Sequence, residues 1–105
     1  MITRDIRLMK YWKNLKMSYK INFSETSLKQ LRKLDNLSRK RILNYVSDVL
    51  TKIENPRILG KALTGDLKGF WRYRIGNFRI VCQIQDNSLL ILILKIAHRK
   101  EIYLS

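Results

Sequence analysis

The side chains best suited to chemistry in this sequence are arginines that surround a predicted hairpin turn. Gly76-Asn77 separates two alternating apolar segments and has the length and composition of a two-residue turn. Counting outward from this turn pairs Arg74 with Arg79 and places Arg72 on the same face, two residues along the strand. Guanidinium groups carry a permanent charge and bind phosphate oxygens through paired hydrogen bonds. The spacing therefore predicts a site for a phosphate group.

The neighbouring sequence does not compensate this clustering of charge. Like charges directly opposite one another destabilise a sheet by roughly a few tenths of a kcal/mol. Residues 67–85 contain no Asp or Glu that would offset the repulsion. The functional interpretation is anion binding, and the alternative is that the arginine stems only solvate an exposed sheet face.

The only histidine, His98, is predicted on the same face as the arginines. A second two-residue turn, Asp86-Asn87, pairs Ile84 with Leu89 and puts the even-numbered residues of the last strand on the arginine face. Histidine is the residue type whose side chain exchanges a proton most readily near neutral pH, which makes His98 a candidate to move a proton. The alternative is an ordinary surface histidine.

Length and charge restrict the class of protein. The chain has 105 residues, with 22 Lys and Arg against 8 Asp and Glu, and a net charge of +14. This length suits one small domain with one core. Hydrophobic residues make up 46% of the sequence, which is too many for a disordered polycation. The charge therefore belongs to a folded domain and favours a polyanionic partner: RNA, DNA, an acidic protein or an anionic membrane.

Several kinds of site are disfavoured by what the sequence lacks. No apolar stretch approaches the roughly 18 residues of a membrane span. The single cysteine, Cys82, excludes an intramolecular disulfide, and a reducing cytoplasm is the simplest compartment. Residues 60–65 have the glycine spacing of a phosphate loop, but Asp66-Leu67 follows where Lys-Ser/Thr is needed. The acids are scattered, so we expect no metal and no other cofactor.

Alternation and capping signals predict the order β-α-α-β-β-β. A strand over 18–23 precedes a helix capped by Ser24 and a second helix, capped by Ser38, that ends at Asn55-Pro56. A loop over 57–69, which leaves room for the start of a short strand, leads to strands at 71–75, 78–84 and 89–97. The prediction is an α+β fold with two antiparallel helices packed on a mostly antiparallel four-stranded sheet.

The chain divides into an N-terminal segment and one domain. Residues 1–16 are expected to be a basic extension, optional or a mis-called start if Met17 is the true first residue. Residues 17–105 are expected to form the functional domain.

Three segments resemble the RelE/ParE toxin superfamily. They are Leu63-Thr64-Gly65, the hairpin from Trp71 to Val81, and the run Ile96-Ala97-His98-Arg99-Lys100-Glu101-Ile102-Tyr103. The likeness covers roughly residues 18–103 and includes the order of elements. Three short motifs in the right order and spacing make it fairly specific.

The resemblance implies a cytoplasmic toxin of a toxin–antitoxin pair. Toxins of the RelE branch enter the A site of the 30S ribosomal subunit and cut mRNA without a metal, as the 2′-hydroxyl attacks the adjacent phosphate. The implied partners are a RelB-like antitoxin, acidic at the contact and bound in a hetero-oligomer, and the ribosome with its mRNA and rRNA. No membrane partner is implied.

Motif position also implies roles for individual residues. Arg79 matches the arginine that contacts the scissile phosphate, Arg99 the basic residue that assists the leaving group, and Tyr103 the tyrosine that orients or stacks on the base. The expected catalytic residues are Arg74, Arg79, His98, Arg99 and Tyr103, and the expected RNA-binding residues are Lys61, Lys68, Arg72 and Lys100.

One departure from the family pattern concerns the general base. Lysines often occupy the first hairpin strand, and one has been assigned as the base, but Arg72 and Arg74 stand here. The guanidinium of arginine stays protonated at neutral pH and is a poor base. Either Arg74 acts purely electrostatically or another group takes the proton: His98, with Lys61, Lys68 and Glu101 as weaker candidates.

Two other functions stay open. ParE-type relatives inhibit DNA gyrase and need no nuclease residues, although the clustered His98, Arg99 and Tyr103 argue against this target. A non-enzymatic RNA-binding or ribosome-associated module fits the basic charge equally well.

Overall fold

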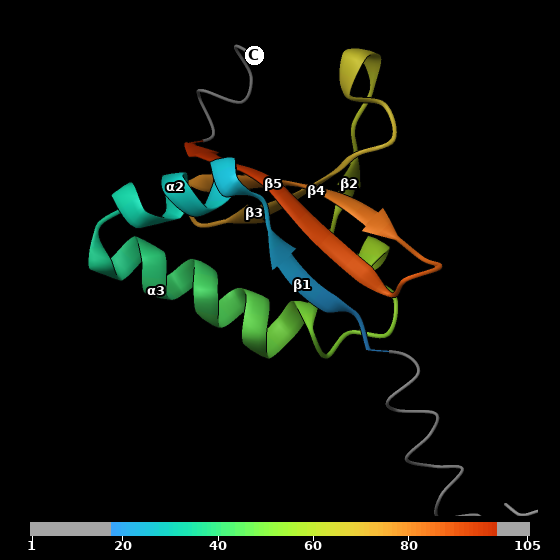
Figure 1. Ribbon diagram of the computed structural model, residues 1–105, viewed down its shortest axis with the longest axis horizontal. Helices are drawn as coiled ribbons and strands as arrows, with labels where there is room; N and C mark the ends of the chain where they lie inside the picture. The colour runs from blue at the N-terminus through green and yellow to red at the C-terminus, as the bar shows by residue number, and fades with distance from the viewer. Residues whose placement is uncertain (1–17, 99–105) are drawn as a thin grey trace, which may run out of the picture.

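The computed structural model describes residues 18–98 (Figure 1). In chain order the elements are β1 (Lys20–Phe23), α2 (Glu25–Lys33), α3 (Asn36–Tyr45), β2 (Lys61–Ala62), β3 (Trp71–Ile75), β4 (Phe78–Gln85) and β5 (Leu90–His98). A π-helical turn, Val46–Leu50, continues α3, and short 3-10 turns occupy Pro56–Ile58 and Gly65–Leu67. No helix in this described range is long and apolar enough to cross a membrane.

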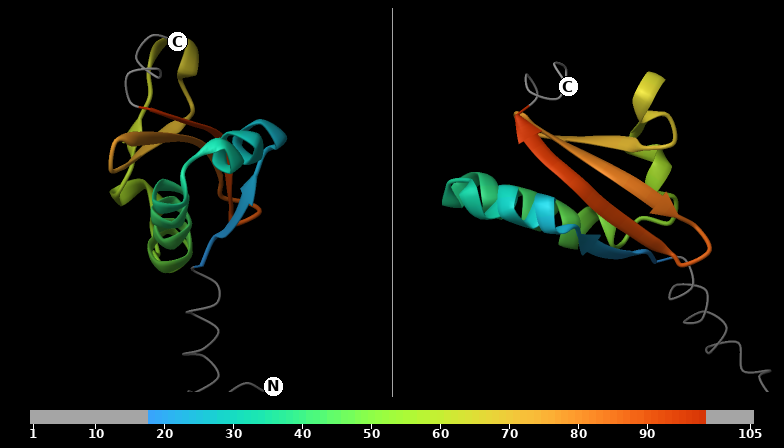
Figure 2. Two further views of the ribbon diagram at one scale, coloured as in Figure 1. Left: turned by 90° about the vertical axis from the view of Figure 1, so that its left-hand side faces the viewer. Right: turned by 45° about the horizontal axis from the view of Figure 1, so that its top comes forward.

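The described residues form a layer of helices on a layer of sheet. The strand order is β1-β5-β4-β3-β2, with β1 parallel to β5 and the other neighbours antiparallel. Helices α2 and α3 lie on one side of the sheet, as the views in Figure 2 show. The α+β class and the mostly antiparallel sheet are confirmed. The predicted strand count of four is wrong, because Lys61 and Ala62, assigned to a loop, pair with β3 as a fifth, two-residue strand.

The helices begin at capping side chains. Ser24 accepts a hydrogen bond from the backbone N–H of Ser27 at 3.1 Å, as predicted for the first helix. The second helix starts earlier than expected, since Asp35 is its cap and accepts from the N–H of Ser38 at 3.1 Å. Ser38 is therefore a residue of the first turn, and its role as the cap is a wrong prediction.

The predicted end of the second helix is also corrected. The α-helical hydrogen-bond pattern stops at Tyr45, and the π-helical turn that follows ends at Leu50. Pro56 starts a separate 3-10 turn, where a missing N–H costs nothing, and Asn55 caps it by accepting from the N–H of Arg57.

The core lies between the helices and the sheet. Ile42 and Leu50 from the helical side meet apolar residues of the three longest strands. The sheet contributes fully buried side chains from β3, β4 and β5: Tyr73, Ile80, Cys82, Ile91 and Ile93. These residues alternate along their strands, so the intervening side chains project from the opposite sheet face.

The turn between β4 and β5 is longer than the sequence predicted. Gln85 pairs with Leu90, so the loop spans residues 86–89 rather than two residues. Leu89 adopts a left-handed conformation with φ of 50°. Ile84 pairs with Ile91 and not with Leu89, which shifts the register of the last strand.

Asp86 holds this loop through contacts that are distant in sequence. Its carboxylate accepts hydrogen bonds from the Tyr19 hydroxyl at 2.7 Å and from Arg57 at 3.0 and 2.8 Å. The guanidinium of Arg57 also lies 5.6 Å from the centre of the Trp71 ring. The network joins β1, the 3-10 turn after α3 and the β4–β5 loop.

We expect Asp86→Asn to lower thermal stability at neutral pH and to have little effect in acid. The hydrogen bonds from Arg57 and then Tyr19 hold the pKa of Asp86 below its usual value. The stabilisation is therefore present at neutral pH and is lost as the pH falls below about 4, through the lowered pKa. Melting curves of wild type, Asp86→Asn and the exposed control Asp66→Asn at pH 7 and pH 3 test this. An Asp86→Asn deficit that persists at pH 3 would contradict it.

Candidate functional site

The β3–β4 hairpin has the register that the sequence predicted. Arg74 lies opposite Arg79, Arg72 lies opposite Val81, and Ile75 lies opposite Phe78 across the turn. Gly76 has φ of +59°, a conformation that glycine adopts without strain. The two facing arginines are thus a property of the fold.

These arginines lie on the sheet face opposite the helices, which we call the open face. Directly paired residues share a face, so the pairings also place Lys61 beside Arg72 and Lys95 beside Val81. Around the arginines the open face carries Lys61, Arg72, Arg74, Arg79, Val81, Lys95 and Ala97, and it continues along β4 and β5 with Gln83 and Leu92. The predicted RNA-binding residue Lys61 therefore joins the arginine cluster.

Exposure differs sharply between the paired arginines. Arg74 is exposed, whereas Arg79 is only 1% exposed to solvent. The alternative interpretation, arginine stems on an exposed sheet face, requires exposure, and Arg74 meets that condition while Arg79 does not. A guanidinium in such a position acts through a lower effective dielectric, so its charge has a stronger effect on any anion that reaches it.

The loop between β2 and β3 packs on part of the open face. Leu63 and Phe70 contact a small cluster formed by Val81 and Ala97, and the N–H of Leu63 donates to the carbonyl of Phe70 at 3.0 Å. This closes the base of the loop and supports β3. Lys68 is exposed and follows the 3-10 turn of the same loop, which projects beyond β2 in Figure 1.

The arginines divide into those with internal partners and those without. Arg39 donates to the backbone carbonyls of Leu31 and Leu34, and Arg57 is paired with Asp86. Within residues 18–98, the side chains of Arg72 and Arg74 make no hydrogen bond or ion pair. Their guanidinium donors are therefore available to an external anion.

His98 lies on the opposite face from the one predicted. It pairs with Phe78, while Arg79 pairs with Ala97. The His98 and Phe78 rings meet edge to face with their centres 5.8 Å apart. His98 therefore shares the helix side of the sheet, and its predicted place beside Arg72, Arg74 and Arg79 is wrong.

A β-bulge explains the error. Val81 pairs with Lys95 but Cys82 pairs with Ile93, so Leu94 is an extra residue that has no partner of its own. Up to Leu92 the even-numbered residues of β5 share the face of Gln83, as expected, and beyond the bulge the odd-numbered residues do. The same inversion brings Lys95 onto the open face. Sequence counting missed this lysine because no residue type announces the bulge.

Within residues 18–98, Cys82 and the acidic side chains add neither a nucleophile nor a metal site to the arginine cluster. Burial raises the pKa of the Cys82 thiol far above its usual value, which removes it as a nucleophile at neutral pH. No three His, Cys, Asp or Glu side chains between residues 18 and 98 are grouped so that they would hold a metal ion.

Other predicted features fall outside the described residues. These are the catalytic candidates Arg99 and Tyr103, the RNA-binding candidate Lys100, the weaker base candidate Glu101 and the N-terminal extension 1–16. Their roles stay predictions.

Comparison with known proteins identifies related toxins. The family model for the ParE toxin of type II toxin–antitoxin systems matches residues 21–103. The toxin RelG of Mycobacterium tuberculosis is 29% identical over 87 residues, which cover 83% of this chain and 98% of that protein. The mRNA interferase toxin RelE of Escherichia coli is 29% identical over 90 residues, covering 83% of this chain and 92% of that protein.

Solved structures agree with this grouping. A chain of the toxin–antitoxin complex RelBE2 from Mycobacterium tuberculosis superposes with a TM-score of 0.73 and 26% identity. The match covers 79% of this chain and 93% of the other.

Proposed function

Because this chain belongs to the ParE toxin family of type II toxin–antitoxin systems, within the RelE/ParE superfamily, we propose that it is an endoribonuclease toxin that cuts mRNA on the ribosome. The names of its relatives favour the RelE branch, since one of them is an mRNA interferase. Cleavage of mRNA would place its action in the cytoplasm, where ribosomes translate.

One observation carries the proposal. Arg72 and Arg74 present guanidinium groups without partners inside the described part of the chain, on a hairpin whose sequence from 67 to 85 has no acid. Two arginines without partners, placed next to a third, do not stabilise the fold, so the stability of the fold does not explain why they lie there. A phosphate that receives their hydrogen bonds supplies the missing counter-charge.

The proposed reaction is a transesterification. The 2′-oxygen attacks the adjacent phosphorus, the bond from phosphorus to the 5′-oxygen breaks, and a 2′,3′-cyclic phosphate and a 5′-hydroxyl result. The 2′-hydroxyl gives up one proton and the leaving oxygen gains one. Arginines beside the phosphate stabilise the charge that builds up on its oxygens, and this step needs no metal.

Arg74 and Arg79 have different parts in this proposal. Arg74 is exposed and makes the first contact with the phosphate, with Arg72 and Lys61 beside it. Arg79 is 1% exposed, so it reaches the phosphate once binding displaces the residues over it. Arg74 acts electrostatically, because a guanidinium does not take up a proton from a 2′-hydroxyl.

The proton transfers are proposed for His98 and Tyr103, and Arg99 is proposed, from the family motif, to assist the leaving group. His98 lies on the helix side of the sheet end, where its partner Phe78 follows the hairpin turn, so its part in the reaction requires action around the edge of the turn. Lys68 and Lys100 are proposed to bind flanking RNA phosphates.

We also propose a RelB-like antitoxin as partner. The related M. tuberculosis structure is a toxin–antitoxin complex. A net charge of +14 favours an antitoxin that is acidic where it touches this chain and that forms a hetero-oligomer with it.

The test is codon-positioned cleavage of mRNA in a purified translation system. We expect primer extension to reveal cuts at the A site that require both the chain and ribosomes. A single 2′-deoxy nucleotide at the cut position should block cleavage there, because the nucleophile is gone. Intact mRNA in the presence of folded chain would overturn the nuclease proposal.

The same preparation separates the two alternative functions. Gyrase supercoiling is expected to continue in the presence of the chain, and its inhibition would instead favour the ParE-type target. Ribosome binding without any cut would favour a non-enzymatic RNA-binding module.

A further inference from the structure

Arg41 of α3 packs against the turn of the arginine hairpin. A Cβ atom placed on Gly76 would lie 2.8 Å from Nη1 of Arg41 and 3.4 Å from its Cδ. The side chain therefore runs along the turn, at the end of the sheet that holds Arg74 and Arg79. Arg41 itself is exposed.

The guanidinium of Arg41 has no partner of its own. Within residues 18–98 it makes no hydrogen bond and no ion pair. Residues 36–47, which surround it on the helix, contain no Asp or Glu. A charge held at a fixed place without a counter-ion is suited to an external anion.

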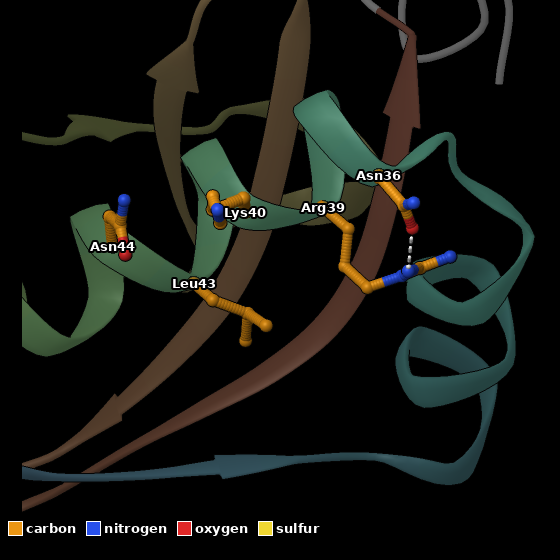
Figure 3. A pocket seen from close by; sticks show the side chains of 5 residues that line it. All are labelled: Asn36, Arg39, Lys40, Leu43 and Asn44. Carbon is orange, nitrogen blue, oxygen red and sulfur yellow. Dashed lines mark hydrogen bonds between the residues drawn. The ribbon is translucent and has the colours of Figure 1, made fainter.

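Arg39, on the same helix, shows what a structural arginine does here. Its Nη1 donates to Oδ1 of Asn36 at 2.8 Å (Figure 3). Its other nitrogens donate to carbonyls at the end of α2. These bonds close the turn between the two helices. The guanidinium of Arg41 makes no such hydrogen bonds within residues 18–98.

The helix side of this sheet end also carries an aromatic pair. Phe78 follows the turn directly, and its ring meets the ring of His98 edge to face. Both residues share the sheet face that α2 and α3 cover, and both are half-exposed. Arg41, Phe78 and His98 thus border the same side of the turn, opposite the open face.

We propose that the RNA path crosses the β3–β4 turn and that Arg41 binds the phosphate next to the one held on the open face. The RNA would pass from Arg74 over Gly76 to Arg41. The Phe78–His98 pair would be available to a nucleobase, since unpaired bases stack on aromatic side chains. This inference deepens the proposed function and rests on RNA being the substrate.

The test compares binding of a single-stranded RNA that carries a 2′-deoxy nucleotide at the cut position. For Arg41→Gln we expect the dissociation constant to rise about 3- to 10-fold near 0.1 M salt, and the log–log salt slope to fall by about 0.7, which corresponds to one lost phosphate contact. On programmed ribosomes KM should rise while kcat changes little, because Arg41 binds and does not react.

Two variants serve as controls. Lys52→Gln removes one exposed positive charge from the turn that follows α3 and its π-helical continuation, and should change the dissociation constant by less than about twofold. Arg41→Lys keeps the charge and should restore most of the affinity. Arg41→Gln behaving like Lys52→Gln would overturn the inference.

A further measurement separates RNA from protein as the ligand of Arg41. If Arg41→Gln weakens antitoxin binding and leaves RNA binding intact, Arg41 belongs to a protein interface and the inference is wrong. If wild type binds RNA through Arg41 but cuts no mRNA, the inference stands and the nuclease proposal fails.

Discussion

The Arg79→Met variant is expected to lose mRNA cleavage while it keeps its fold. Methionine retains an unbranched apolar stem that fills much of the same space, in a position that is only 1% exposed. The lost guanidinium acts on charge that builds up in the transition state. We therefore expect kcat to fall about 10²- to 10³-fold.

The measurement is single-turnover cleavage on programmed ribosomes, with melting temperature and antitoxin binding as checks of the fold. Arg74→Gln keeps the test decisive if Arg79→Met unfolds, because Arg74 is exposed and its loss does not disturb the core. Arg74→Gln should act mainly on KM. Wild-type cleavage by both folded variants would show that the open face is not the active site.

The substitution that we expect to lower the free energy of unfolding most is Tyr73→Ala. The ring of Tyr73 is fully buried, and a Cβ atom on Gly60 would lie 3.1 Å from its Cε1. Its hydroxyl donates to the carbonyl of Pro56, in the 3-10 turn that follows α3. Tyr73→Ala should lower the free energy of unfolding by about 3–5 kcal/mol, a large part of the total for a small domain.

Tyr73→Phe separates the hydroxyl from the ring. It should cost about 1–3 kcal/mol, since it leaves the Pro56 carbonyl without its donor. The control is Tyr45→Phe. The ring centres of Tyr45 and Tyr73 lie 6.4 Å apart, but the Tyr45 hydroxyl makes no hydrogen bond within the described range. Urea unfolding of the three variants gives the comparison, and equal losses for both Tyr→Phe changes would contradict it.

The pH dependence of stability gives a separate signature of the buried Tyr73 phenol. Burial raises the pKa of the Tyr73 phenol, so folding favours its protonated form. The stabilisation is present below the ordinary tyrosine pKa of about 10 and is lost as the pH rises further. The stability gap between wild type and Tyr73→Phe should therefore narrow above about pH 10.

Tyr73 also links stability to the proposed site. It lies between Arg72 and Arg74 on β3, and its side chain points into the core while theirs lie on the open face. Loss of its anchor would loosen the strand that carries both arginines. Tyr73→Phe should accordingly lower cleavage less than Arg74→Gln, at temperatures where both variants are folded.

The sequence by itself determined the β3–β4 hairpin and everything that follows locally from it. A two-residue turn at Gly76-Asn77 sets the pairing of its flanking residues, because register in a tight hairpin depends only on the count from the turn. This count predicted the facing pair Arg74 and Arg79 and the apolar partners Tyr73 and Ile80. The cap at Ser24 was also predicted locally, from the residue type that precedes the first helix. The motif resemblance gave the family for the same reason, since it rests on local segments.

Only the tertiary structure decided where the last strand places its side chains. The Asp86 loop is held by Tyr19 and Arg57, which are far away in sequence, and the extra residue Leu94 lies where Ser24 of the helix layer donates to its carbonyl. Both features depend on packing between distant elements, so no local count finds them. The bulge moves His98 to the helix side and brings Lys95 to the open face, while the longer loop shifts the pairing along β5 without changing the face. A one-residue insertion in a strand inverts every later side chain, and this is why a correct hairpin still led to a wrong face for the only histidine.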